Sequence, residues 1–154
     1  MKLEEAILNI FIKKKKTLAV AESCTGGLIS SRVTDVSGSS KYFKGAVVAY
    51  ANDVKIDILG VPSALIKKHG AVSREVAKEM AIGVREILGS DVGVAVTGIA
   101  GPTGSSKDKP LGLAYVALST NTHTKTKKVQ FKGDRPEIKD KFAESVLKLI
   151  KENV

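Results

Sequence analysis

A serine between an apolar segment and a pair of glycines is the residue of this sequence best placed to do chemistry. Residues 20–28 read Val-Ala-Glu-Ser-Cys-Thr-Gly-Gly-Leu, so Ser23 follows an apolar strand and precedes a helix that the two glycines open. Such a junction exposes a hydroxyl beside backbone N–H groups that lack partners within the helix. An acyl-transfer nucleophile and its oxyanion donors require this arrangement, so Ser23 is a candidate nucleophile. The candidate oxyanion donors are the backbone N–H groups around Thr25, Gly26 and Gly27.

Two other interpretations of this stretch stay open. Cys24 competes with Ser23 as the nucleophile, because a thiol near a helix N-terminus is activated. Ser23 also fits a purely structural role as a helix cap, with Gly26 and Gly27 allowing close packing. Replacing Ser23 and Cys24 by alanine, one at a time, separates the two nucleophiles.

A second polar and glycine-bearing segment, residues 97–104, follows a later apolar strand and offers backbone N–H donors for a phosphate or a ribose. Arg135 adds a fixed positive charge that can pair with phosphate, although it also fits an ordinary first-turn residue of a capped helix. Both are candidate phosphate ligands. The candidate binding residues in these two places are Thr97, Gly98, Ala100, Gly101, Pro102, Gly104 and Arg135.

The elements that must position these residues follow from hydrophobic periodicity and turn signals. Apolar residues at helical spacing predict helices over residues 2–15, from Leu28 to the turn at 37–40, from Ser73 to Gly89, and onward from the capping-box sequence that begins at Asp134. Short apolar or alternating runs predict strands at 17–21, 45–51, 92–96, 111–119 and 125–131.

This order of elements predicts a single domain, residues 1–154, of the α/β class. Helices between the early strands imply parallel pairing, and the late pair of strands implies an antiparallel hairpin. We therefore expect a three-layer α/β/α sandwich with a mixed, mostly parallel sheet. Ligands gather at the carboxyl ends of the strands in such sheets, so Ser23, Tyr50 and the Thr97 loop are expected to share one crevice.

Composition limits the partners and the location of the protein. The formal net charge is +9, but only four of the 25 basic residues are arginines and there is no tryptophan, so a solvated lysine surface is favoured over a nucleic-acid site. No apolar run is long enough for a membrane span, and the lone Cys24 cannot form an internal disulfide. No cluster has metal-ligand spacing. We expect a cytoplasmic protein with a small-molecule substrate and with no metal, stable nucleic-acid or membrane partner.

Six motifs in order along the chain resemble those of a known family. They are Ala-Glu-Ser-Cys-Thr-Gly-Gly at 21–27, Tyr-Ala-Asn-Asp-Val-Lys at 50–55, His-Gly-Ala-Val-Ser at 69–73, Thr-Gly-Ile-Ala-Gly-Pro at 97–102, Lys-Pro-Leu-Gly at 109–112 and Gly-Asp-Arg at 133–135. Together they resemble the CinA carboxy-terminal domain family, whose single-domain members are nicotinamide-nucleotide amidases. The resemblance covers nearly the whole chain, and the ordered series is specific although each motif alone is weak.

The resemblance implies hydrolysis of the carboxamide of nicotinamide mononucleotide to nicotinate mononucleotide and ammonia, in pyridine-nucleotide recycling. It implies Ser23 as the nucleophile with Tyr50 and Lys55 as its partners, no cofactor, and a homodimer.

The chain departs from the family pattern at three positions. Ser105 replaces a usual glycine, and Lys139 and Lys141 replace a usual arginine and glutamine. These changes concern substrate affinity and specificity more than the type of reaction.

Lys55 can serve as a base only as a neutral amine. At a reference pKa of ~10.4 about one lysine in 2,500 is neutral at pH 7, so the pKa must fall by roughly 2 to 3 units, which desolvation can supply. In a helical turn over residues 52–59, Asp53 and Asp57 point away from Lys55. We expect Lys55 to face the cleft and both aspartates to face water, with Tyr50 relaying the proton or orienting the amine.

Two alternatives belong to other functional classes. Taken locally, Tyr50 also fits a core aromatic and Lys55 a solvated surface residue, which would leave a noncatalytic nucleotide-binding module. The other alternative is a lysine-rich nucleic-acid accessory protein, which predicts salt-dependent binding to duplex DNA and indifference to replacement of Ser23. Ammonia release from nicotinamide mononucleotide separates the amidase from both.

Overall fold

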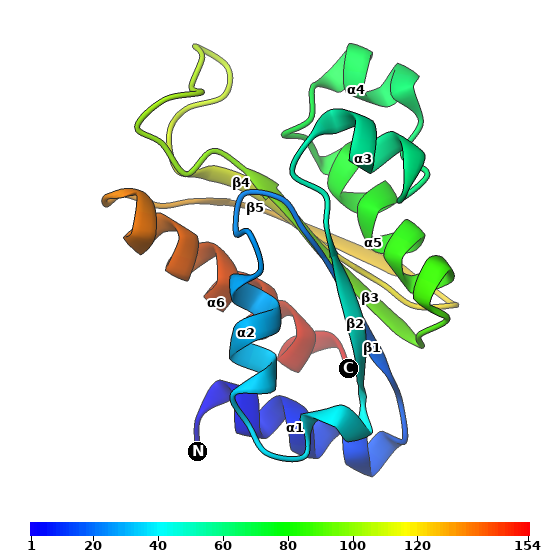
Figure 1. Cartoon of the computed structure of the whole chain (residues 1–154). Coiled ribbons are helices and arrows are strands. Elements are labelled where there is room, and N and C mark those ends of the chain that lie inside the picture. Colours follow the sequence, from blue (N-terminus) through cyan, green and yellow to red (C-terminus); the bar gives the residue numbers. More distant parts are fainter.

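A five-stranded sheet runs through the centre of the computed structural model, which describes residues 1–154 (Figure 1). The strand order is β2-β1-β3-β4-β5, and β1 pairs in parallel with both β2 and β3, whereas β3, β4 and β5 pair antiparallel. Four strands therefore share one direction and β4 opposes them, which confirms the mixed sheet and the late hairpin. The strands are β1 (Leu18–Glu22), β2 (Phe43–Val48), β3 (Val92–Gly98), β4 (Leu113–Ser119) and β5 (Thr124–Gln130).

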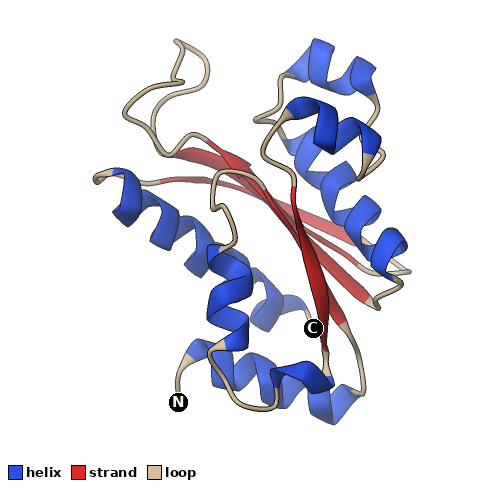
Figure 2. Ribbon diagram, in the orientation of Figure 1, coloured by secondary structure: helices blue, strands red, loops and turns tan.

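Helices cover both faces of this sheet, so the α/β class is also confirmed (Figure 2). One face carries α1 (Leu3–Lys14), α2 (Leu28–Thr34) and α6 (Arg135–Asn153), and the other carries α3 (Asn52–Asp57), α4 (Ser63–His69) and α5 (Arg74–Leu88). Each face has its own apolar cluster, one of 23 buried residues and one of 12. The larger cluster lies beneath α1, α2 and α6, so the helix that follows Ser23 is anchored over the main core.

Small residues let α5 lie close to the sheet. A Cβ added to Gly93 of β3 would lie 2.3 Å from the carbonyl oxygen of Ala81 in α5, so no larger residue fits there. Ala19, Ala21 and Ala95 lie in the cluster on this face of the sheet. The close approach of α5 brings the chain before it, which includes Lys55, against the carboxyl ends of the strands.

Helix ends follow their sequence signals closely. The Ser73 side chain accepts a hydrogen bond from the N–H of Val76, and Gly89 ends α5 with a positive φ of 62°. Asp134 and Glu137 form the predicted capping box at the start of α6. These predictions are confirmed.

Several boundaries differ from the sequence prediction: α2 already ends at Thr34, and β3 continues to Gly98. The second strand begins at Phe43 and ends at Val48, not at 45–51, so Ala49 and Tyr50 lie in the turn before α3. The fourth strand begins at Leu113 because Gly112 has a φ of +78°, and a Cβ there would lie 1.8 Å from the carbonyl oxygen of Phe131. Helix α4 was not predicted, because it buries no residue fully and so leaves a weak apolar pattern.

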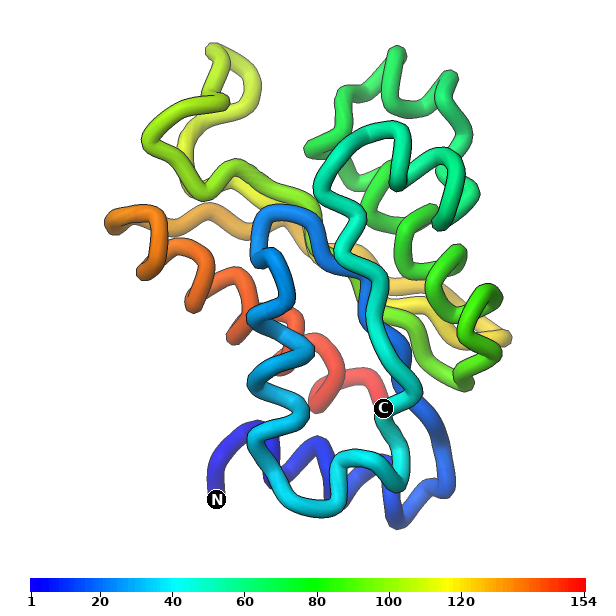
Figure 3. The backbone as a smooth tube through the Cα atoms, in the orientation of Figure 1, coloured from blue at the N-terminus to red at the C-terminus, as the bar shows by residue number.

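The chain ends lie away from the carboxyl ends of the parallel strands (Figure 3). The ammonium of Lys14 in α1 donates to the backbone carbonyl of Val154, which ties the last residue to the first helix. The loop between β3 and β4 extends from the opposite end. No helix combines the length and the apolar character needed to cross a bilayer.

Candidate active site

A cavity of about 310 Å³ opens at the carboxyl ends of the parallel strands. It brings together residues that follow three different strands: Ser23 after β1, Tyr50 and Lys55 after β2, and the loop after β3. Arg135, at the start of α6, also lines it. The predicted shared crevice is therefore present, with all three catalytic candidates on its wall.

The predicted binding residues divide into two groups. The loop residues Thr97, Gly98, Ala100 and Gly104 line the cavity with Arg135, whereas Thr25, Gly26, Gly27, Gly101 and Pro102 do not.

Glu22, the last residue of β1, organises the turn that carries Ser23. Its carboxylate is fully buried and accepts five hydrogen bonds. The donors are the Thr25 hydroxyl at 2.6 Å, the backbone N–H groups of Gly27, Ile29 and Ser30 at 3.0–3.1 Å, and the Ser30 hydroxyl at 2.6 Å. The carboxylate thus fills the N-terminus of α2, where unpaired N–H groups favour an anion.

Sequence reasoning missed this role of Glu22, although a signal was available. A helix that begins after Gly27 has no capping side chain of its own, so an acceptor must come from elsewhere. Glu22 is the acidic residue just before the turn, and the hydroxyls of Thr25 and Ser30 are further donors.

The same contacts narrow the choice of oxyanion donors. The N–H of Gly27 is engaged by Glu22, and that of Gly26 donates to the carbonyl of Ser23 at 3.1 Å. Their predicted role as oxyanion donors is not supported by these bonds. The backbone N–H groups of Cys24 and Thr25 donate to no carbonyl or carboxylate of the protein, so these two remain available.

Lys55 is buried on the wall of the cavity. Only 2% of the residue is exposed, and its amine donates to the carbonyl oxygens of Ala49 at 2.8 Å and Tyr50 at 3.1 Å. Burial lowers the pKa of the Lys55 amine below its ordinary value, against a weaker opposing effect of Cys24. Asp53 and Asp57 are exposed, so the predicted helical turn with Lys55 inward and the aspartates outward is confirmed.

The two carbonyl contacts can hold the Lys55 amine in either protonation state. A neutral amine can donate its two N–H groups to these two carbonyl oxygens. Its lone pair then remains free to accept a proton. No hydrogen bond joins the Lys55 amine to the Ser23 hydroxyl in the free protein, and Ser23 is 7% exposed.

Cys24 also lines the cavity, but its burial disfavours it as a nucleophile at neutral pH. It is buried, and burial raises the pKa of its thiol to about 12. Its side chain belongs to the large apolar cluster under α2 and α6. The thiol is therefore protonated, which favours Ser23 between the two candidates.

Tyr50 and Arg135 meet at the cavity mouth. The Tyr50 side chain is exposed, and its hydroxyl accepts a hydrogen bond from the Arg135 guanidinium at 3.1 Å. The same guanidinium donates to the carbonyl of Gly101 at 2.6 Å. Tyr50 thus touches Lys55 through its backbone carbonyl and Arg135 through its hydroxyl.

Other predicted polar residues hold the walls in place. The buried Thr97 hydroxyl donates to the carbonyl of Ala71 at 2.9 Å. The Lys109 ammonium donates to the carbonyls of His69 and Val72. These bonds fix the segment between α4 and α5 as one side of the cavity. The Thr97 hydroxyl proton is already donated to Ala71 and is not available to a ligand.

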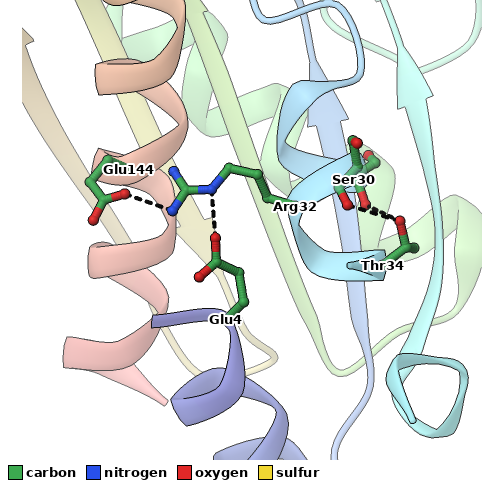
Figure 4. A network of polar contacts seen from close by, with 6 residues as sticks. Glu4, Ser30, Arg32, Thr34 and Glu144 are labelled. Atoms are coloured by element: carbon green, nitrogen blue, oxygen red, sulfur yellow. Dashed lines mark hydrogen bonds and ion pairs between the residues drawn. The ribbon is translucent and has the colours of Figure 1, made fainter. Parts of the chain in front are cut away.

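Helix α2 is also fixed from its outer side. Arg32 of α2 contacts Glu4 of α1 and Glu144 of α6, each at 2.7 Å (Figure 4). Although burial opposes the effect, hydrogen bonds from its own backbone and from Arg32 hold the pKa of the Glu4 carboxyl below its ordinary value. The ion pairs bind α2 to both neighbouring helices, so the Ser23 turn is supported from both ends of its helix.

The histidines lie outside the cavity. His69 has a ring nitrogen 3.8 Å from the Glu75 carboxylate, and His123 lies in the β4–β5 turn against Thr120. Neither lines the cavity, so neither replaces Lys55 as the base for Ser23.

These features define an α/β protein in which a serine hydroxyl and a buried lysine share a polar cavity at the carboxyl ends of the parallel strands. The sequence matches the CinA C-terminal domain family over residues 1–154. The chain belongs to this family.

Curated relatives and solved structures agree with this assignment. A CinA-like protein of Geobacter sulfurreducens is 50% identical over 145 residues, which are 94% of this chain and 35% of that protein. A CinA-like protein of Dictyoglomus thermophilum is 47% identical over 137 residues, 89% of this chain and 33% of that protein. The chain therefore spans about a third of the length of these relatives.

Among solved structures, the competence/damage inducible protein CihA from Agrobacterium tumefaciens superposes with a TM-score of 0.94 at 36% identity, over 96% of this chain and 91% of that one. The competence damage-inducible protein A (ComA) from Klebsiella pneumoniae gives a TM-score of 0.95 at 28% identity, over 98% and 94%. Proteins of nearly the same length thus share the whole fold.

Proposed function

We propose that the protein is a serine-dependent amidohydrolase that converts nicotinamide mononucleotide and water to nicotinate mononucleotide and ammonia. The observation that carries the proposal is the burial of Lys55, with a lowered pKa, in the same cavity as Ser23. The substrate comes from the family resemblance of the motifs at Ser23, Tyr50 and Lys55. A cavity of about 310 Å³ is at the small end of the range for small-molecule sites.

In the first half of the reaction, the neutral Lys55 amine accepts the hydroxyl proton of Ser23 while the serine oxygen bonds to the amide carbon. The N–H groups of Cys24 and Thr25 stabilise the oxyanion that forms. The Lys55 ammonium then returns the proton to the leaving nitrogen, the carbon–nitrogen bond breaks, and ammonia departs from an acyl ester on Ser23.

In the second half, Lys55 takes a proton from water, whose oxygen attacks the ester carbon. The ester bond to Ser23 breaks, the proton returns to the serine oxygen, and the carboxylic acid product ionises and leaves. Tyr50 positions the amine, because its backbone carbonyl is one of the two acceptors that hold Lys55.

The charge of the cavity suits an anionic substrate. Its lining carries the permanently charged Arg135 and includes no aspartate or glutamate. A pyridine nucleotide with a phosphate can therefore enter without meeting a carboxylate on the wall.

The test is an assay of purified protein with nicotinamide mononucleotide, in which ammonia and nicotinate mononucleotide are both quantified. Ser23→Ala and Lys55→Met are expected to remove nearly all turnover while remaining folded, and Cys24→Ala is the matched control at the neighbouring position. Equal amounts of both products from the wild type, lost in the two variants, support the proposal. Turnover that survives in Ser23→Ala rejects the serine mechanism.

A noncatalytic nucleotide-binding module is the second candidate. The Lys55 amine makes no hydrogen bond to the Ser23 hydroxyl in the free protein. This favours the module, because a general base must come within hydrogen-bond reach of the proton that it removes. Binding of nicotinamide mononucleotide without release of ammonia would establish the module and reject the amidase.

A further inference from the structure

We propose that Lys139 acts with Arg135 as a clamp for the phosphate of the substrate, and that Lys139 makes the site prefer a phosphate monoester over its dephosphorylated counterpart. The inference rests on the proposed function and adds to it a specificity-determining residue. Lys139 does not line the main cavity, and the sequence marked it only as a departure from the family pattern that concerns affinity and specificity.

The position of Lys139 beside the nucleophile turn carries the inference. A Cβ built on Gly26 would lie 3.9 Å from the Lys139 ammonium, so this charge lies over the turn that holds Ser23. Arg135 and Lys139 are four residues apart on α6, which places them on the same face one turn apart.

Arg135 and Lys139 both line a second hollow beside the main cavity. It has a volume of about 280 Å³ and is lined by Leu28, Arg135, Pro136, Lys139 and Asp140. Arg135 lines both this hollow and the main cavity, so the two spaces are neighbours. A substrate with its carboxamide at Ser23 can extend past Arg135 toward Lys139.

Both cations are free to bind an anion. Arg135 has no carboxylate within ion-pair distance and donates only to two neutral oxygens, those of Gly101 and Tyr50. The Lys139 ammonium makes no hydrogen bond or ion pair and is partly buried. Asp140 is the one acid that lines the hollow, so two positive charges face one negative charge.

The other usual places for a phosphate are already engaged. The N-terminus of α2 would ordinarily attract a phosphate, but the Glu22 carboxylate fills it. On the opposite wall, the Thr97 hydroxyl and the Lys109 ammonium donate to backbone carbonyls. Arg135 and Lys139, at the start of α6, therefore remain as cations that can neutralise a phosphate.

The test compares two ligands that differ only in the phosphate. Nicotinamide mononucleotide and nicotinamide riboside are titrated by calorimetry into Ser23→Ala protein, in which hydrolysis does not disturb the measurement. With Lys139 present, the mononucleotide is expected to bind more tightly than the riboside. Lys139→Met is expected to reduce that preference roughly fivefold to twentyfold, since one charge-assisted contact is lost, and Lys139→Arg to retain it.

Lys141→Met is the matched control. Lys141 lies on the same helix, but its ammonium donates to the carbonyl of Lys132 on the far side of the capping turn. This variant removes one positive charge without touching the hollow, so its preference for the mononucleotide should equal that of the parent.

The outcomes separate this proposal from the proposed function. An unchanged preference in Lys139→Met, or an equal loss in Lys139→Met and Lys141→Met, overturns the clamp. A preference that depends on Lys139, in a protein whose wild type releases no ammonia, retains the clamp and rejects the amidase.

Discussion

Two buried ionisable side chains, Glu22 and Lys55, lie at the carboxyl ends of the neighbouring strands β1 and β2, and their surroundings differ. The Glu22 carboxylate after β1 receives five hydrogen bonds, whereas the Lys55 amine after β2 has two carbonyl contacts. The five donors satisfy the Glu22 carboxylate, so it holds the turn in place. Lys55 is desolvated with few partners, so its proton is weakly held. Glu22 therefore fits a group that shapes the site, and Lys55 fits the base of the proposed reaction.

The largest effect is expected from Lys55→Met. The change keeps an apolar stem of similar length and removes the base, so kcat for nicotinamide mononucleotide should fall by roughly 10²- to 10⁴-fold. The measurement is steady-state ammonia release, with circular dichroism to show that the fold persists. Lys67→Met, at an exposed lysine of α4, should leave kcat unaltered. If the Lys55 variant keeps more than a tenth of the wild-type kcat, Lys55 is not the base, and it does not differ from Glu22 in function.

Glu22→Gln should lower stability more than any other substitution in the turn. In glutamine an NH2 group, which is a donor, replaces one of the two carboxylate oxygens. The backbone N–H and the hydroxyl of Ser30 then lose the oxygen to which they donate. We expect a loss of about 2 to 4 kcal/mol in the free energy of unfolding, measured by urea denaturation. Ser30→Ala removes one hydroxyl contact and should cost about 1 kcal/mol. If both variants unfold at the same urea concentration as the wild type, Glu22 does not organise the turn.

The pH dependence of kcat/KM tests the state of Lys55. Burial lowers the pKa of this amine, so the active neutral form persists to lower pH than for an exposed lysine. Activity should be lost on acidification, about tenfold per pH unit below the pKa of the folded protein, and should reach a plateau above it. A limb that rises only near the ordinary pKa of lysine would show that burial does not tune the base.

The smallest effect is expected from Cys24→Ala. Since the thiol pKa is raised to about 12, the side chain is protonated and takes no part as a nucleophile at neutral pH. The kcat should change by less than about threefold, with a loss of stability of about 1 kcal/mol from the lost packing. A loss of activity as large as that of Ser23→Ala would restore the thiol as the nucleophile.

The sequence was most informative where one local signal sufficed. The caps at Ser73 and Asp134 depend on contacts within one helical turn, and both were predicted. Helix phase predicted that Lys55 and its neighbours Asp53 and Asp57 would point to different sides, but the burial of Lys55 could not be predicted from the sequence.

Features that depend on distant contacts were harder to predict. The pairing of Arg135 with Tyr50 joins residues 85 positions apart, and the ammonium of Lys139 reaches Gly26 from another helix. The role of Glu22 required knowledge that the helix after Gly27 lacks its own cap. The early end of β2 was missed because Ala49 and Tyr50 continue the alternating pattern beyond the last strand pair.

The placement of the chain ends has a practical consequence. Helix α6 has 19 residues and is about 28 Å long, with Arg135 at the cavity and its last turn beside α1. A purification tag or a fluorescent reporter joined at either end would thus sit far from the route that a nucleotide takes to Ser23. Immobilised or labelled protein should accordingly retain full access for small ligands.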